Sequence, residues 1–170
     1  MSHDPSLHAK ILTVSDSISA QSREDLSGTA LAEHLAGAGY EVIERRVVPD
    51  DVEEISNALS YMAYGFNGLI VTTGGSGFGQ RDMTPEATRR ILDRPAPGIA
   101  EAMRNVSPRG RVSRATAGTR GSSLVLNLAA APDRAIEMLS AVLDVVPEIL
   151  GLLGGGSVPT VDAVRLTTTD

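Results

Sequence analysis

Four short runs of strand-forming residues, separated by stretches with helical character, limit most strongly what this chain can fold into. The run 69–73 (LIVTT) predicts a short, fully buried strand, and the runs 9–15 and 123–128 predict two more. The run 40–48 (YEVIERRVV) alternates apolar and polar residues, which is typical of a half-exposed or edge strand. Because strands and helices alternate along the chain, we expect an α/β fold with a mostly parallel sheet covered by helices on both faces.

Helices are predicted between and beyond these runs. Asp51 and Glu54 fit a capping box, which places a helix start at this point. Thr84 fits an N-cap that is followed by Pro85 at the first helical position. Pro147 is expected to stop or kink the longest helix. The predicted helices cover residues 29–38, 51–64, 84 onward, 98–105 and 132–146.

Length and composition fit one domain of ordinary size. With 170 residues, of which 42% are hydrophobic, the chain can bury a sizeable core without disulfides or a metal. We expect a single domain over residues 1–170, with its core at about 9–150 and residues 154–170 as a tail or arm. No membrane span or signal peptide is recognisable, so a cytoplasmic protein without a membrane partner is expected. The net charge of −6 argues against a nucleic-acid partner.

Scarce residue types exclude several kinds of chemistry. The chain has no cysteine, which removes thiol nucleophiles, cysteine-bound zinc and iron–sulfur clusters. Lys10 is the only lysine, so Schiff-base chemistry and a P-loop lysine are almost excluded. The histidines, His3, His8 and His34, have no metal-ligand spacing. Arginine remains as the main cation, and its guanidinium can bind a phosphate with two hydrogen bonds.

The strongest local signal is the segment 72–86 (TTGGSGFGQRDMTPE), where a buried strand leads through glycines into a capped helix. Glycines let the backbone approach an anion closely, and a helix N-terminus offers it free N–H groups. The segment lacks the G-K-[ST] of a Walker loop and does not fit GxGxxG. We interpret it as a phosphate-binding loop of another kind, and the alternative is a flexible turn with ordinary glycines.

Two aspartates are candidate functional groups beside this loop. Asp51 already serves as a helix cap, which leaves its neighbour Asp50 as the freer carboxylate. A carboxylate beside a phosphate loop repels the phosphate unless Mg²⁺ lies between them. Asp50 and Asp82 are therefore a candidate metal-and-phosphate pair, with Asp50 as the Mg²⁺ ligand. The alternative is a solvated aspartate in a turn.

A basic segment follows at residues 107–123 (SPRGRVSRATAGTRGSS). Its arginines lie among small residues and are Arg109, Arg111, Arg114 and Arg120. Such a cluster fits a dianionic phosphate or a pyrophosphate, and a solvated loop is the alternative. Residues 15–17 and 127–132, which follow the first and last predicted strands, carry no diagnostic pattern of their own.

Taken together, these segments resemble the molybdenum-cofactor biosynthesis proteins of the Mog/MoaB type. The resemblance rests on residues 72–77 (TTGGSG), on residues 81–88 (RDMTPEAT) and on Pro49-Asp50. Within residues 112–128, the pieces VSR, AG, GSSL and NL match a second motif region. The resemblance extends over residues 9–150, and its first motif is long and specific.

This resemblance implies a three-layer αβα sandwich, the fold of molybdenum-cofactor biosynthesis proteins, assembled as a homotrimer. It implies molybdopterin adenylyltransferase activity, in which MgATP and molybdopterin give adenylylated molybdopterin and pyrophosphate. Mg²⁺ would be the cofactor, ATP and molybdopterin the substrates, and a molybdate-insertion protein a further partner. Arg114 or Arg120 could neutralise an anionic group in this reaction, and Mg²⁺ held near Asp50 could bridge phosphates.

The resemblance also implies roles for individual residues. Asp50 and Asp82 would be the catalytic carboxylates. Ser107 and Ser113 match positions associated with molybdopterin contact, and Asn127 opens a loop associated with the nucleotide. The residues expected to bind substrate or nucleotide are Gly74, Gly75, Ser76, Gly77, Thr84, Ser107, Ser113, Arg114 and Asn127.

Three departures from the family pattern bear on the activity. Residues 129–132 read AAAP where the family loop is typically Pro-Gly-x-Pro, Ser17 stands where arginine is common, and the segment 107–113 is shorter than usual. The altered loop 129–132 favours an alternative, a catalytically silent molybdopterin-binding or scaffold paralogue. The intact Asp50, Asp82 and glycine loop favour the enzyme. A hydrolase of a small phosphorylated metabolite, a third alternative, lacks an evident nucleophile or general base.

Overall fold

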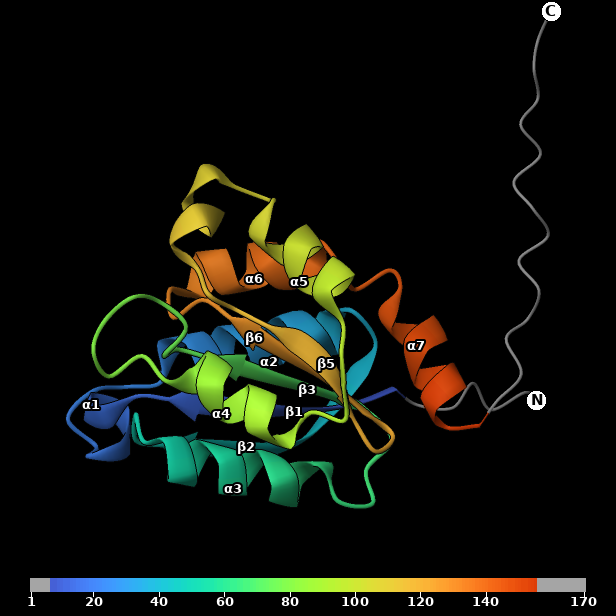
Figure 1. Cartoon of the computed structure of the whole chain (residues 1–170), viewed down its shortest axis with the longest axis horizontal. Coiled ribbons are helices and arrows are strands. Elements are labelled where there is room, and N and C mark those ends of the chain that lie inside the picture. The colour runs from blue at the N-terminus through green and yellow to red at the C-terminus, as the bar shows by residue number, and fades with distance from the viewer. Residues whose placement is uncertain (1–6, 156–170) are drawn as a thin grey trace, which may run out of the picture.

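Six strands form one sheet at the centre of the computed structural model, which describes residues 7–155 (Figure 1). They are β1 (Leu7–Val14), β2 (Tyr40–Val48), β3 (Leu69–Thr73), β4 (Arg94–Pro95), β5 (Ala117–Arg120) and β6 (Ser123–Leu128). Their order across the sheet is β2-β1-β3-β6-β5-β4. The first four in this order pair in parallel, whereas β5 pairs antiparallel with β6, and β4 with β5. The predicted mostly parallel sheet is confirmed.

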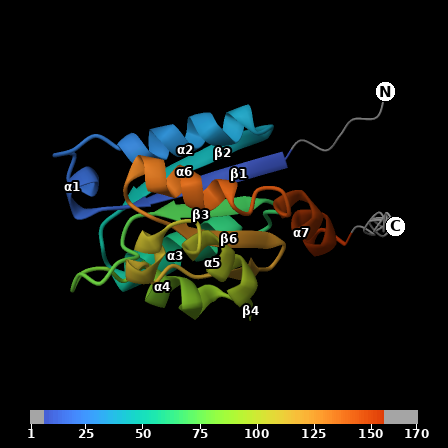
Figure 2. The same ribbon diagram turned by 90° about the horizontal axis from the view of Figure 1, so that it is seen from above.

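Helices cover both faces of this sheet, which makes the fold a three-layer α/β/α sandwich (Figures 1 and 2). They are α1 (Asp16–Ser19), α2 (Leu26–Gly37), α3 (Val52–Ala63), α4 (Thr84–Ile91), α5 (Pro97–Arg104), α6 (Pro132–Ser140) and α7 (Val146–Leu153), with the 3-10 helix η1 (Pro108–Val112). α3 and α4 pack on one face, and α2, α5, α6 and α7 pack on the other. Within residues 7–155, no helix is long and apolar enough to cross a membrane.

Alternation along the buried strands explains why a separate core forms on each face. In β3, Leu69 and Val71 belong to the core beneath α2, α5, α6 and α7, whereas Ile70 belongs to the core beneath α3 and α4. β6 divides in the same way between Leu126 and Val125. Both strands are buried on both faces, as the run of strand-forming residues at 69–73 predicts.

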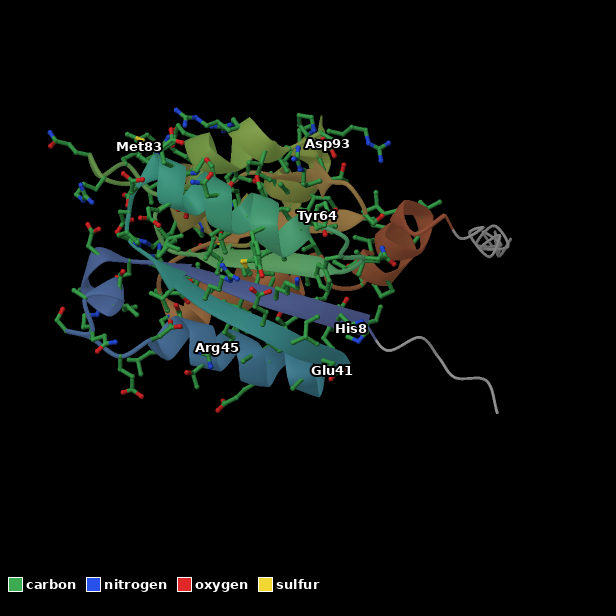
Figure 3. The ribbon with its side chains drawn as sticks, turned by 90° about the horizontal axis from the view of Figure 1, so that it is seen from below. His8, Glu41, Arg45, Tyr64, Met83 and Asp93 are labelled. Carbon is green, nitrogen blue, oxygen red and sulfur yellow. The ribbon has the colours of Figure 1, made fainter. Side chains whose placement is uncertain are left out.

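The alternating strand, β2, lies at the edge of the sheet, as predicted. Its Glu41 and Arg45 side chains are exposed at this edge (Figure 3). Arg45 also forms an ion pair with Asp25, just before α2, at 3.3 Å. Charged side chains on an edge strand hinder its pairing with a further strand.

Two predicted helices have wrong boundaries. α2 begins at Leu26 rather than at residue 29, because the Asp25 carboxylate accepts the N–H of Gly28 at 2.9 Å and caps the helix earlier. The helix predicted over 132–146 ends at Ser140, and a turn at residues 141–145 leads into α7. Pro147 lies in the first turn of α7, where backbone N–H groups have no partner within the helix, so the N–H that proline lacks is not needed.

The predicted helix caps are confirmed at Asp51 and wrong at Thr84. Asp51 Oδ1 accepts the N–H of Glu54 at 3.0 Å. The N–H of Asp51 donates to the carbonyl of Pro49 at 2.8 Å, in place of the reciprocal bond of a capping box. Thr84 is the first residue of α4 and Met83 is its N-cap, since the Thr84 hydroxyl is bonded to the glycine loop instead.

The short elements β4, β5 and α1 have no clear sequence signature. β4 has 2 residues and α1 has 4. β5 contains Gly118, where a Cβ would lie 2.5 Å from the carbonyl oxygen of Arg94. None of the three shows the periodicity from which longer elements are recognised. The tail expected at 154–170 lies outside the described residues apart from 154 and 155.

Candidate functional site

The carboxyl ends of β1, β2, β3 and β6 meet at one edge of the sheet, on the left in Figure 1. Loops at residues 15–25, 49–51, 74–83 and 129–131 leave these ends. Ligands of open parallel sheets bind at this edge, beyond the strands. The structure brings three predicted parts of the site together here: the glycine loop, Asp50 and Asp82.

The glycine loop, residues 74–83, begins with two residues in the left-handed region of φ. Gly74 has φ +96, and a Cβ there would lie 2.2 Å from the carbonyl oxygen of Val14. Gly75 has φ +69, and a Cβ there would lie 2.3 Å from Thr84 Oγ1 and 3.2 Å from Asp50 Oδ1. Only glycine combines this backbone conformation with such close approaches, so the local glycine pattern is a structural requirement of the loop.

Thr84, a predicted binding residue, supports the loop from inside the protein. Its side chain is buried, and Oγ1 donates to the carbonyl of Gly74 at 2.9 Å. Its N–H donates to the carbonyl of Gly75 at 3.0 Å. Ser76 is also mostly buried, with its hydroxyl 3.4 Å from the carbonyl oxygen of Leu128. These bonds fix the start of the loop against α4 and β6.

Asp50 is held at the end of β2 by the loop that follows β1. Its N–H donates to Asp16 Oδ1, and the N–H of Asp16 donates to Asp50 Oδ2, both at 3.0 Å. Arg81, from the glycine loop, donates to both carboxylate oxygens of Asp16 at 2.6 and 3.0 Å. Three loops are thereby tied together around the Asp50 carboxylate.

The pKa values of the two linked carboxyl groups shift in opposite directions. Burial raises the pKa of Asp50, and the nearby carboxylates of Asp16 and Asp82 add to this effect. Hydrogen bonds from Arg81 lower the pKa of Asp16. The negative charge of Asp50 is therefore poorly compensated by the protein, and a cation beside it would be favoured.

Asp82 lies near the other end of the glycine loop. Its Oδ2 accepts the N–H of Gly79 at 2.8 Å. A Cβ at Gly77 or Gly79 would lie 3.0 or 2.9 Å from this oxygen. The later glycines of the loop therefore make room for the Asp82 carboxylate.

Two clefts open at this edge of the sheet and share a border. The first has a volume of about 250 Å³ and is lined by the ends of β1 and β3, the loop 15–25, the start of α2, Asp50 in the loop after β2, and the start of the glycine loop. The second has a volume of about 170 Å³, and the residues that it does not share with the first are Ser76, Gly77, Arg109, Val112, Ser113, Ala129 and Arg134. Gly75, Asp82 and Ala130 line both clefts. Among the residues 7–155, Asp82 is the carboxylate that these two clefts have in common.

Arg114, a predicted anion ligand, is engaged with the glycine loop. Its Nε donates to the carbonyl of Gly77 and a terminal nitrogen donates to the carbonyl of Asp82, both at 2.6 Å. The guanidinium also forms an ion pair with Glu86 on α4. Burial is the largest single influence and works against the charge of Glu86, but the hydrogen bonds from Arg114 and from the backbone, with the charges of Arg114 and Arg89, together lower the pKa of Glu86. Arg114 thus stabilises the glycine loop and lines neither cleft.

Arg120, the other predicted anion ligand, lies away from the site. It bonds to the carbonyl of Ile91 at 3.1 Å and to Asp93 at 3.4 Å. Figure 3 places Asp93 far from Met83, the residue that precedes α4 at the site. Arg120 is therefore not brought together with the glycine loop.

Asn127, predicted to open a nucleotide loop, is fully buried. Its amide nitrogen donates to Thr72 Oγ1 and Thr88 Oγ1 at 3.0 and 2.9 Å, and its oxygen accepts the N–H of Thr116 at 3.2 Å. These bonds join β3, β6 and α4 beneath the site, and Asn127 lines neither cleft.

The two predicted serines lie at and beside the second cleft. Ser113 lines the cleft itself. Ser107 precedes η1 and accepts the N–H of Arg109 at 3.2 Å, capping that short helix. Ser107 lines a narrow neighbouring pocket, to which Ser113 and Arg109 also belong. The basic segment thus reaches the second cleft through η1.

The carboxylates do not form a cage for a resident metal. Within residues 7–155, no group of three or more histidine, cysteine, aspartate or glutamate side chains could hold a metal ion. Mg²⁺ commonly takes one or two protein carboxylates and completes its shell with water and substrate phosphates. Asp50 and Asp82 fit this second arrangement, in which the metal arrives with a phosphate ligand.

Sequence reasoning missed two arginines that line the clefts, Arg23 and Arg134. Arg23 lies in the loop before α2, and Arg134 in the first turn of α6. Neither belongs to a motif, so only their positions after the first and last predicted strands could have pointed to them.

A protein-family model described as "Probable molybdopterin binding domain" matches residues 10–150. Among curated proteins, the molybdopterin adenylyltransferase of Helicobacter pylori (strain J99) is 36% identical over 156 residues, which are 88% of this chain and 89% of that protein. The molybdopterin adenylyltransferase of Escherichia coli (strain K12) is 34% identical over 146 residues, which are 81% of this chain and 74% of that protein.

Solved structures give the same picture of the fold. The molybdopterin biosynthesis enzyme MoaB of Thermus thermophilus superposes with a TM-score of 0.83 and 43% identity, covering 89% of this chain and 99% of that one. The molybdopterin biosynthesis Mog protein of Mycobacterium ulcerans superposes with a TM-score of 0.79 and 30% identity, covering 89% and 99%. The arrangement of strands and helices described above is shared with these proteins over nearly their whole length.

Proposed function

The chain belongs to the family of molybdopterin-binding domains that its residues 10–150 match, and from this we propose that it is a molybdopterin adenylyltransferase of molybdenum-cofactor biosynthesis. It transfers AMP from MgATP to molybdopterin and releases pyrophosphate. The names of its curated relatives support this reaction. The observation that carries the proposal is the pair of clefts that meet at Asp82, because an adenylyl transfer needs two anionic substrates side by side.

We assign MgATP to the first cleft. It is the larger of the two, and the raised pKa of Asp50 favours a cation there, which the nucleotide brings with it. The glycine loop offers its backbone to the phosphates, because Gly74 and Gly75 carry no side chain that would cover it.

Molybdopterin is assigned to the second cleft. Ser113, whose position matches one associated with molybdopterin contact, lines this cleft. Arg109 and Arg134 line it too, and arginine is well suited to the terminal phosphate of molybdopterin. The phosphate of molybdopterin and the α-phosphorus of ATP then meet at the border formed by Gly75, Asp82 and Ala130.

The chemistry requires little covalent work from the protein. An oxygen of the molybdopterin phosphate attacks the α-phosphorus, the bond from that phosphorus to the bridging oxygen breaks, and pyrophosphate leaves. Positioning of the two substrates and neutralisation of their charge supply most of the acceleration. Asp82, at the border, and Asp50, in the first cleft, would hold the Mg²⁺ that accompanies the nucleotide, and the metal would neutralise charge on the phosphates.

The alternative, a silent molybdopterin-binding paralogue, rests on the alanines of the loop 129–132. Ala130 lines both clefts, so the missing Pro-Gly turn lies at the border where transfer would occur. The loop is nevertheless fixed, because Thr73 Oγ1 donates to the carbonyl of Ala129 at 2.8 Å. We therefore favour the enzyme.

The family resemblance also supports proposals on the assembly, location and partner of the protein. We propose that the chain assembles as a homotrimer, acts in the cytoplasm and hands its product to a molybdate-insertion protein. Sedimentation equilibrium of the purified chain tests the first of these statements, and a mass other than that of three chains contradicts it.

The activity is tested by incubating the purified chain with molybdopterin and MgATP while adenylylated product and pyrophosphate are followed. The wild-type chain is expected to form both in equal amounts. Asp82→Asn should abolish product formation, because it removes the carboxylate charge that borders both clefts. Asp144→Asn makes the same chemical change at an exposed residue outside the two clefts and serves as the control. Tight binding of molybdopterin without product would support the silent paralogue instead.

A further inference from the structure

Binding of a nucleoside triphosphate in the first cleft creates an excess of negative charge. Asp50 and Asp82 already line this cleft. The nearby Arg81 is bound to Asp16 through both of its carboxylate oxygens. Arg114 is engaged with the glycine loop and Glu86, as described above. A cationic side chain beside the phosphates, in addition to the Mg²⁺ that the nucleotide brings, is therefore favoured.

Arg23 is the arginine that lines the first cleft. Its side chain is exposed, and among residues 7–155 no carboxylate forms an ion pair with it. Arg81, which lies within the glycine loop, and Arg114, which bonds to it, are both paired with carboxylates. Arg23 thus combines a place at the cleft with a guanidinium that the protein itself does not use.

The loop that carries Arg23 is anchored at both ends. On one side, Gln21 has φ +58 and its N–H donates to the carbonyl of Ile18 at 2.9 Å. On the other side, Asp25 caps α2 and accepts a hydrogen bond from Thr13 at 2.8 Å. The base of the side chain is therefore fixed at the rim of the cleft, while the guanidinium stays free to meet a ligand.

We propose that Arg23 binds the β- and γ-phosphates of the nucleotide and holds the pyrophosphate as it leaves. The proposal rests on the assignment of MgATP to the first cleft. The α-phosphorus has to lie at the border with the second cleft, where the attacking phosphate arrives. Arg23 lines the first cleft alone, and adenosine is uncharged, so the outer phosphates are the groups that a guanidinium there can bind.

The test compares direct ligand binding by the Arg23→Ala and Arg90→Ala chains. Arg90 is an exposed arginine of α4 that pairs with Glu53 and lines neither cleft, so its replacement makes the same charge change away from the site. Titration calorimetry measures the affinity of each chain for MgATP, magnesium pyrophosphate, AMP and molybdopterin. Arg23→Ala is expected to weaken MgATP and pyrophosphate about tenfold or more, which corresponds to one lost charge-assisted hydrogen bond. AMP, molybdopterin and the Arg90→Ala chain should be unaffected.

Each result decides the question. Unchanged affinity of Arg23→Ala for MgATP and pyrophosphate overturns the inference. An equal loss of affinity for AMP also overturns it, since the arginine would then bind the α-phosphate. Because binding is measured without turnover, a wild-type chain that forms no adenylylated product contradicts the proposed enzyme but leaves the test of Arg23 intact. A wild-type chain that binds no nucleotide contradicts both.

Discussion

Replacing Gly75 by alanine tests whether the glycine loop is held in a conformation that only glycine allows. The added Cβ would lie 2.3 Å from Thr84 Oγ1 and 3.2 Å from Asp50 Oδ1, on a backbone with φ +69. Thr84 is fully buried and uses this hydroxyl to bond the carbonyl of Gly74. The substitution therefore strains the backbone and removes a buried hydrogen bond at the same time.

The expected cost follows from these two effects. An L-residue in the left-handed region costs about 1–2 kcal/mol relative to glycine. Displacing the Thr84 hydroxyl leaves the carbonyl of Gly74 without its partner, which costs about 1–3 kcal/mol more. We expect Gly75→Ala to lower the free energy of unfolding by about 2–5 kcal/mol in total.

Urea unfolding, followed by circular dichroism, measures this difference. Gly151→Ala is the matched control, because Gly151 lies within α7 with open space where a Cβ would be added. There alanine should stabilise the chain by about 0.5–1 kcal/mol through its higher helix propensity. A Gly75→Ala chain as stable as the wild type would refute the argument that steric exclusion fixes this loop.

Substitutions at two further residues probe the charges of the site. Because the pKa of Asp50 is raised in the folded chain, its ionised carboxylate lowers the free energy of unfolding above that pKa. The Asp50→Asn chain should therefore unfold at a higher urea concentration than the wild type at neutral pH. It should also lose Mg²⁺-dependent transfer. This advantage in stability should disappear as the pH falls below the ordinary pKa of aspartate, and a constant advantage at all pH values would contradict the assigned cause. Arg114→Ala should lower the free energy of unfolding by about 2–3 kcal/mol and reduce transfer, since it frees the carbonyls of Gly77 and Asp82 and leaves Glu86 only its longer ion pair with Arg89 at 3.9 Å. Arg114→Lys keeps the charge but not the forked geometry, so its free energy of unfolding should lie between those of the wild type and Arg114→Ala. An Arg114→Ala chain as stable as the wild type would contradict the role of Arg114 in holding the glycine loop.

The sequence was sufficient to predict the order of the main strands and helices. The buried run 69–73 and the alternating run 40–48 indicate a central and an edge strand because burial imposes a different pattern on each. The end of α6 could not be predicted in the same way. Residues 141–145 continue the apolar pattern of a helix, and the turn there depends on packing against the rest of the chain.

Parts of the candidate site follow from the sequence where a residue type has one main structural use. Glycines after a buried strand indicate a tight loop, and the structure gives Gly74 and Gly75 positive φ. Arginine is harder to interpret, because the same guanidinium binds a phosphate or a backbone carbonyl. Arg114 and Arg120 lie in the conspicuous basic segment but bond to the protein, whereas Arg23 lies alone in its loop and lines a cleft. Tertiary contacts decide which arginine remains available to bind a ligand, and no local sequence pattern predicts these contacts.

Adenylyl transfer requires that two substrates meet at the border of the clefts and that AMP passes from one to the other. Incubation of the wild-type chain and molybdopterin with MgATP labelled at the α-phosphorus, and separately at the γ-phosphorus, follows both parts of the nucleotide. We expect the α-label to enter molybdopterin and the γ-label to leave as pyrophosphate. Transfer of the γ-label to molybdopterin, its release as inorganic phosphate, or binding of both substrates without movement of either label would show that the proposed reaction is wrong.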